Sequence, residues 1–203
     1  NKNDLISARA NLEISELDLE RALAACQSNL GDLPNRHILH HFPLGCKIDS
    51  KRVPGRPEGL RGNKLELKTL FVHCLSQHLN DLIKVVEAAG LNIDEVVAAP
   101  LASSIAVLTP TQKAAGCTLA NIGSQTTSLI TYEDGEPIAV QVLPIGSNDI
   151  TNDIALGLRL SLDEAERIKL DPMTALHVKR KLDEIIEARV IDMFELIDGH
   201  LKK

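Results

Sequence analysis

The chain has 203 residues and a formal net charge of −6 at pH 7. Aromatic residues make up only 2% and Trp is absent, which argues against nucleic acid as a partner, since single strands stack on aromatic faces and phosphate backbones need a positive field. Hydrophobic residues at 44% and charged residues at 25% are typical of a folded globular protein. The four cysteines form no C-x-x-C pair, and we expect reduced thiols in a cytoplasmic protein.

The first half of the chain predicts a small α+β module. In chain order we expect a strand over 5–14, a helix from the capping box Ser15/Asp18 to about Gln27, a β-prone stretch over 37–48, turn and loop over 49–63, a strand over 64–74, a helix over 77–89 and a short strand over 95–98. Leu65, Leu67 and Phe71 alternate with polar residues, so one face of that strand should be buried. We expect both helices to pack on one face of the sheet.

The second half of the chain combines a hairpin with several helices. The expected elements are an apolar helix after Pro100, strands over 118–122, 127–132 and 138–143 with a turn at Asp134-Gly135, a helix from Gly146, a helix from the capping box Ser161/Glu164 to about Lys169, and one long helix over 178–200.

A tight loop of small and hydroxyl residues lies between the first two strands of this second half. Backbone N–H groups and Thr hydroxyls in a strand–loop–strand unit, here Gly123 to Thr127, can cradle a phosphate group. The same pattern fits an ordinary hairpin with a polar turn, so the loop alone leaves both interpretations open.

Six segments, taken together and in order, resemble FtsA, the actin-like membrane tether of the bacterial division ring. They are Pro100–Leu108, Leu119–Leu129, Leu143–Gly146, Asp149–Leu158, Glu164–Lys169 and Glu184–Arg189. The resemblance implies an α+β to α/β fold, namely a fragment of the actin-like, ribonuclease H-like ATPase-type fold with an inserted small α+β module. Residues 1–98 would be an interaction module like subdomain 1C of that family, and residues 99–203 a partial nucleotide-side domain like 2A and 2B.

The resemblance also implies a nucleotide site. Its candidate residues here are Asn121, Gly123, Ser124, Gln125, Thr126, Thr127, Gly146, Glu184 and Glu187. No catalytic residue is assigned. No metal ligands are assigned either, because His37, His40 and His41 lack a Cys, Asp or Glu at ligand spacing and are expected to be ordinary strand histidines.

The loop departs from the family's usual D-I-G-G-G-T-T-D pattern. Asn121 replaces an Asp that would help to hold a metal through its charge. Ser124 and Gln125 replace glycines, and their side chains disfavour positive φ and close approach to phosphate. We therefore expect weak binding of ATP and Mg²⁺ in the intact protein and little hydrolysis, as in a scaffold rather than a working enzyme.

Two further departures concern the extent of the chain. The family's first phosphate loop and late Gly-rich adenosine loop have no counterpart, and the chain lacks an initiator Met, so we expect a piece of a longer protein. Only residues 171–177 separate the last two helices, where the family has a longer, partly β segment. Either that segment is deleted here or residues are missing from the sequence.

The resemblance implies a division scaffold at the cytoplasmic face of the bacterial inner membrane. Its partners would be further copies, in filaments formed through the 1C-like module, the C-terminal tail of FtsZ bound by 2B, and the membrane through a segment absent from this chain. Two alternatives stay open: a PilM-like platform for type IV pilus assembly, and an active ATPase of the actin and Hsp70 superfamily.

Overall fold

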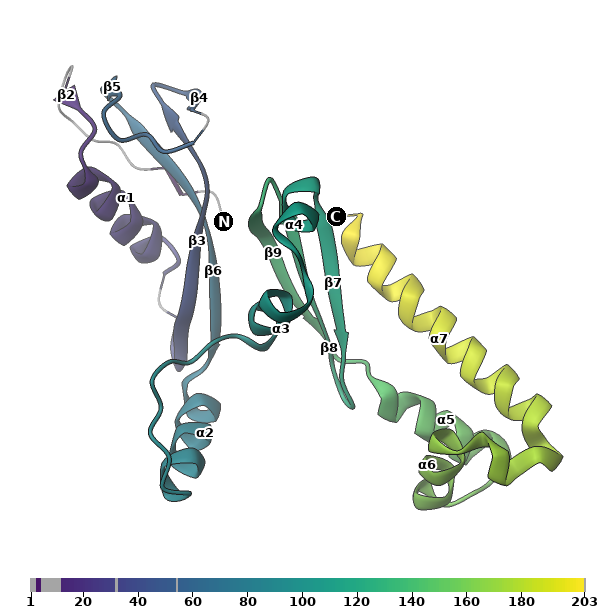
Figure 1. Ribbon diagram of the computed structural model, residues 1–203. Helices are drawn as coiled ribbons and strands as arrows, with labels where there is room; N and C mark the ends of the chain where they lie inside the picture. The colour runs from purple at the N-terminus through teal and green to yellow at the C-terminus, as the bar shows by residue number, and fades with distance from the viewer. Residues whose placement is uncertain (1–2, 5–11, 32, 54, 203) are drawn as a thin grey trace. The chain divides into compact units, whose positions relative to one another are not determined.

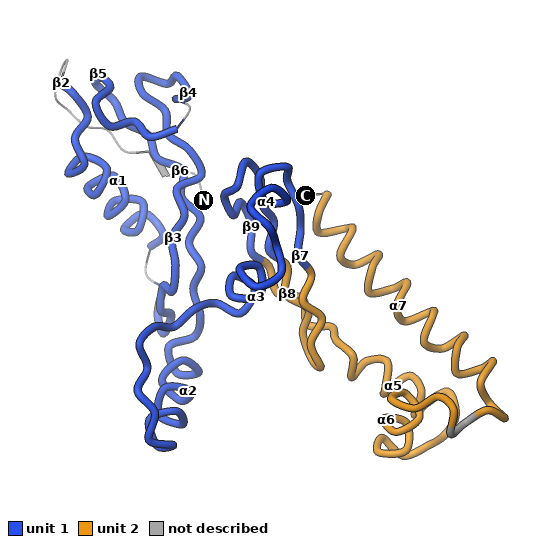
Figure 2. Tube along the Cα trace, in the orientation of Figure 1, with its two compact units in different colours: residues 1–119, 130–140 blue, residues 120–129, 141–203 orange. Residues whose placement is uncertain are grey.

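A computed structural model describes residues 3–4, 12–31, 33–53 and 55–202 (Figure 1). The chain forms two compact units, the first comprising residues 1–119 and 130–140 and the second residues 120–129 and 141–203 (Figure 2). Most of the predicted strand over 5–14 lies outside the described residues. Of that stretch, Leu12–Glu13 forms strand β2.

The first unit contains an antiparallel sheet dominated by two long strands. Its order is β1-β6-β3-β4, formed by Asn3–Asp4, Leu65–Leu75, Arg36–Ile48 and Lys51–Val53. A separate pair joins β2 to β5, Arg61–Gly62. The predicted strands over 37–48 and 64–74 are thus confirmed, and they pair with each other along almost their whole length.

Helix α1, Glu16–Ser28, packs on this sheet as expected. Ser15 and Asp18 form the expected capping box at its start. Cys26 is buried and its thiol donates to the Leu67 carbonyl at 3.3 Å, which ties the helix to β6. The core beneath it contains Ile14, Ala22, Cys26, Cys46, Ile48, Leu65 and Leu67. Burial, reinforced by the charge of Glu58, raises the pKa of the Cys46 thiol and keeps it protonated.

The prediction of turn and loop over 49–63 missed strand β4. Asp49 and Ser50 both have positive φ, 48° and 68°, and form a two-residue turn that pairs Ile48 with Lys51. The Asp49 carboxylate accepts hydrogen bonds from the backbone of Asn63 and Lys64, at 3.1 and 2.9 Å, and stabilises this strained turn.

Two expectations for the next segment were wrong. Helix α2, Ser76–Ala88, forms as predicted and ends before Gly90 at φ 78°, but it has no buried residue and Leu82 is 66% exposed, so it does not pack on the sheet as α1 does. Residues 95–98 form no strand in the described chain. The Ala98 N–H donates instead to the imidazole of His40.

A three-stranded sheet in the order β7-β8-β9 follows, formed by Cys117–Ile122, Thr127–Glu133 and Glu136–Leu143, after helices α3, Ala99–Val107, and α4, Pro110–Ala115. The strands and the turn at Asp134-Gly135, with φ of 52° and 87°, are as predicted. Helix α4 was missed, although Thr109 and Gln112 form a capping box that marks its start.

The second unit is built mainly from helices α5, Ser147–Leu158, α6, Leu162–Leu170, and α7, Lys179–Leu201, with a 3₁₀ helix η1 over Pro172–Val178. Their shared core is formed by Ile154, Ala155, Ala165 and Leu182, with Ile185 and Ile186 of α7 packed against it. Among the described residues, none of the helices is long and apolar enough to cross a membrane.

Candidate functional site

The candidate phosphate loop connects β7 to β8 and is closed by its own backbone. The Gly123 N–H donates to the Thr126 carbonyl at 2.9 Å, and residues 121–126 are exposed. Neither Ser124 nor Gln125 has positive φ. Both residues therefore adopt a backbone conformation that any L-residue tolerates. The expectation that their side chains limit close approach to a phosphate stays a prediction.

The loop is docked on the first turn of α5. The Gly123 carbonyl accepts from the Ser147 N–H at 2.9 Å, and the Ser124 carbonyl accepts from the Asn148 N–H at 2.8 Å. A helix begins with N–H groups that have no partner inside the helix, and here the loop satisfies two of them. This contact brings the predicted residues Gly123, Ser124 and Gly146 together at one place.

Gly146 is the N-cap of α5 and lies directly against the loop backbone. A Cβ at this position would lie 2.5 Å from the Ser124 carbonyl oxygen and 2.6 Å from that of Gly123. The Gly146 N–H donates to the Asp149 carboxylate at 2.8 Å. Only glycine fits here without moving the loop.

The hydroxyl of Thr127 faces the protein interior. The residue is fully buried, and its hydroxyl donates to the Ile145 carbonyl at 2.8 Å. The Thr127 hydroxyl thus donates its proton within the protein. The expectation that this hydroxyl is free to contact a phosphate was wrong. Asn121, Gln125 and Thr126 lie on the exposed part of the loop.

Glu184 and Glu187 are exposed on α7 and are not part of the loop's contacts. Glu184 pairs with Arg180 on its own helix at 3.0 Å. In the described part of the chain, no hydrogen bond joins either glutamate to residues 123–126, and no group of three or more His, Cys, Asp or Glu side chains could hold a metal ion.

A polar cluster that sequence reasoning missed supports the same end of α5. The Lys169 ammonium donates to the Thr151 hydroxyl at 2.8 Å and to the Ser147 carbonyl at 3.3 Å, and it pairs with Glu166 at 2.7 Å. The Thr151 hydroxyl donates to Glu166 at 2.6 Å. These bonds from Lys169 and Thr151 lower the pKa of the Glu166 carboxyl because they stabilise its charged form.

A second ion pair joins the middle of α5 to α7. The Arg189 guanidinium contacts both carboxylate oxygens of Asp153, at 2.5 and 2.9 Å. This bidentate bond raises the pKa of the Arg189 guanidinium. The signal for both clusters was present in the sequence, since the side chains that form them belong to three of the six segments that carry the family resemblance. Periodicity alone does not pair them.

Comparison with solved structures shows which class of fold the chain has. A chain of the PilM-PilN type IV pilus biogenesis complex matches with a TM-score of 0.63 over 98% of this chain and 55% of its own, at 18% identity. The ethanolamine utilization protein EutJ from Carboxydothermus hydrogenoformans matches with a TM-score of 0.51 over 60% of this chain and 42% of its own, at 23% identity. The chain therefore has part of an actin-like fold, as predicted.

Two family models then identify the family. Residues 118–194 match "Cell division protein FtsA", and residues 1–73 match "SHS2 domain inserted in FTSA". The chain is 28% identical to FtsA of Pseudomonas aeruginosa over 225 residues, covering all of this chain and 54% of that protein. It is 31% identical to FtsA of Bacillus subtilis over 182 residues, 89% of this chain and 41% of that protein. It belongs to the FtsA family of cell-division proteins, and it spans about half the length of these relatives.

Replacing Gly146 by Ala should destabilise the second unit by about 2 kcal/mol or more, because the clash is with backbone atoms that cannot rotate away. Urea denaturation measures the change. Gly199→Ala is the matched control: no atom lies within 4 Å of a Cβ at that position in α7, so it should be neutral or stabilising by up to about 1 kcal/mol. Equal effects of both variants would contradict the close approach at Gly146.

The Glu166 cluster should make stability depend on pH. A carboxyl group whose pKa is lower in the folded state stabilises the fold above its unfolded pKa, and this stabilisation is lost as the pH falls through the folded pKa. The free energy of unfolding should therefore fall as the pH drops below about 4.5. Lys169→Met should make that fall shallower, whereas Lys202→Met, at the exposed end of α7, should leave it unchanged. Urea denaturation between pH 7 and 3 measures both slopes, and equal slopes would contradict the assignment.

Proposed function

We propose that this chain is the middle part of an FtsA-type scaffold that self-associates and links the FtsZ ring to the cytoplasmic face of the inner membrane. The family assignment supports a role in division. The chain itself would supply the module through which copies associate and a helical unit that binds the FtsZ tail. Membrane contact would belong to a segment outside this chain.

The observation that favours a scaffold over an active ATPase is that donors of the candidate phosphate loop form hydrogen bonds within the protein. The Gly123 N–H and the Thr127 hydroxyl both donate to carbonyls of the protein itself. Asn121 supplies no negative charge for a metal near this loop. ATP and Mg²⁺ would thus bind weakly in the intact protein, and turnover would be slow.

A pilus platform is the weaker alternative. The chain is 18% identical to the matching chain of the PilM-PilN complex, which shows a similar fold and nothing more. Both family models describe FtsA, and the two relatives named above are cell-division proteins.

Self-association is tested by reversing the charge of Arg21, whose side chain is 65% exposed on α1. In sedimentation of the intact protein with anionic phosphatidylglycerol vesicles, Arg21→Glu should reduce the assembled fraction. Lys202→Glu, at a 72% exposed position outside residues 1–98, is the matched control and should assemble like the parent. Normal assembly of Arg21→Glu would remove this face of α1 from the contact, and normal assembly after deletion of residues 5–98 would reject the module. Co-sedimentation with FtsZ, with and without its C-terminal tail, tests the link to the ring separately.

Nucleotide binding is tested by restoring the family's loop. The intact protein should bind ATP weakly and release phosphate slowly, and Asn121→Asp combined with Ser124→Gly and Gln125→Gly should strengthen binding. Calorimetry and a phosphate-release assay measure the two quantities. Turnover by the parent as fast as by the restored variant would contradict a degraded site. If neither protein binds ATP, the loop is a plain hairpin and the scaffold acts without nucleotide.

A further inference from the structure

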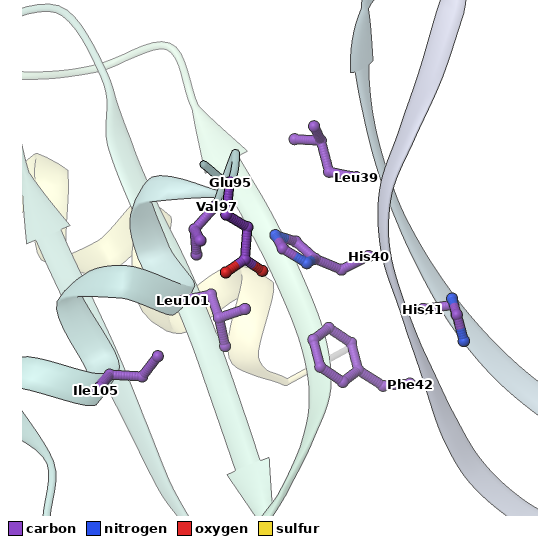
Figure 3. A pocket seen from close by; sticks show the side chains of 8 residues that line it. All are labelled: Leu39, His40, His41, Phe42, Glu95, Val97, Leu101 and Ile105. Atoms are coloured by element: carbon purple, nitrogen blue, oxygen red, sulfur yellow. The ribbon is translucent and has the colours of Figure 1, made fainter. Parts of the chain in front are cut away.

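A shallow pocket in the first unit brings the long strand β3 against the segment that leads into α3. His40 and Phe42 come from the strand, Glu95 from the segment, and Leu101 and Ile105 from the helix (Figure 3). The pocket is separate from the phosphate loop. Its wall is mainly apolar, and its titratable residues are His40, His41 and Glu95, of which His40 and Glu95 face each other (Figure 3).

His40 makes a hydrogen bond that secures the start of α3. Its Nε2 atom accepts the Ala98 backbone N–H at 3.0 Å. Ala98 is the N-cap of α3 and no side chain caps that helix. Residues 91–98 have no strand partner in the described chain, so the His40 ring satisfies a backbone group that a sheet would otherwise satisfy.

The hydrogen bond requires one protonation state of the ring. Nε2 accepts only when it carries a lone pair, so the ring proton must be on Nδ1. Protonation of the ring turns Nε2 into a donor and breaks the bond to Ala98. The anion available in the pocket is then the Glu95 carboxylate (Figure 3). His41, the neighbouring histidine on the strand, also lines the pocket, and its ring lies beside that of Phe71.

The helix that His40 secures is itself tied to the next sheet. The buried hydroxyl of Ser104, in α3, contacts the Tyr132 hydroxyl of β8 at 2.6 Å. The ammonium of Lys113, in α4, lies over the ring of the same tyrosine, 4.8 Å from its centroid. Loss of the hydrogen bond at Ala98 would therefore release the start of α3, while Ser104 still holds the helix to β8.

We propose that His40 is a pH-sensitive latch between strand β3 and the start of α3: closed on Ala98 when neutral, and released toward Glu95 when protonated. Imidazole is the side chain suited to this role, because its charge changes between about pH 5 and 8. The latch depends on neither ATP nor the FtsZ tail, so it stands or falls separately from the proposed function.

Hydrogen–deuterium exchange of the intact protein tests the latch. Exchange of peptides that contain Ala98 is followed at pH 7.5 and 5.5 and divided by the intrinsic rate at each pH. The parent should lose protection about fivefold at the lower pH, the effect of one lost hydrogen bond. His40→Gln should keep its protection at both, since the amide oxygen accepts without titrating.

Two further variants complete the test. Glu95→Gln removes the anion toward which the protonated ring would be released, so the loss of protection at pH 5.5 should be smaller than in the parent. His41→Gln is the matched control, with the same substitution one residue along the strand, and should respond to pH like the parent. Equal protection of the parent at both pH values, or a pH response in His40→Gln as large as that of the parent, would overturn the proposal.

Discussion

The contact on which the second unit depends is the docking of a loop backbone onto a helix N-terminus. Two carbonyls, those of Gly123 and Ser124, accept the first free N–H groups of α5, and the approach is so close that residue 146 must be glycine. One contact therefore fixes the conformation of the loop and starts the helix. It also uses the helix N-terminus internally, where an anion would otherwise find unpaired N–H groups.

Helix α5 can serve as this platform because hydrogen bonds from α6 and an ion pair with α7 hold it from two sides. Lys169 of α6 reaches the Ser147 carbonyl and the Thr151 hydroxyl in its first turns. Further along, Asp153 forms a bidentate pair with Arg189 of α7. Residues from separate family motifs thus hold α5, and α5 in turn holds the loop. A substitution in α6 or α7 that moved α5 would therefore also move Gly123 and Ser124.

Local signals were predictable from the sequence, and non-local pairing was not. The capping boxes at Ser15 and Ser161 and the Asp134-Gly135 turn act within four residues, and each element formed where expected. Strand β4 was missed because its turn uses Asp49 and Ser50 rather than a glycine. The strand over 95–98 was expected from its composition, but a strand also needs a partner, and in this chain the Ala98 N–H bonds to His40 instead.

The same limit applies to the candidate site. Small and hydroxyl residues predicted a loop able to surround phosphate, yet composition does not say which way their donors point. The Gly123 N–H and the Thr127 hydroxyl are already bonded, and each internal hydrogen bond contributes about 1 kcal/mol. A phosphate that recruited both would replace bonds worth about 2 kcal/mol, a loss of about thirtyfold in affinity relative to a loop with free donors. The way the loop is held thus supports the proposal of weak nucleotide binding, in addition to the missing charge at Asn121.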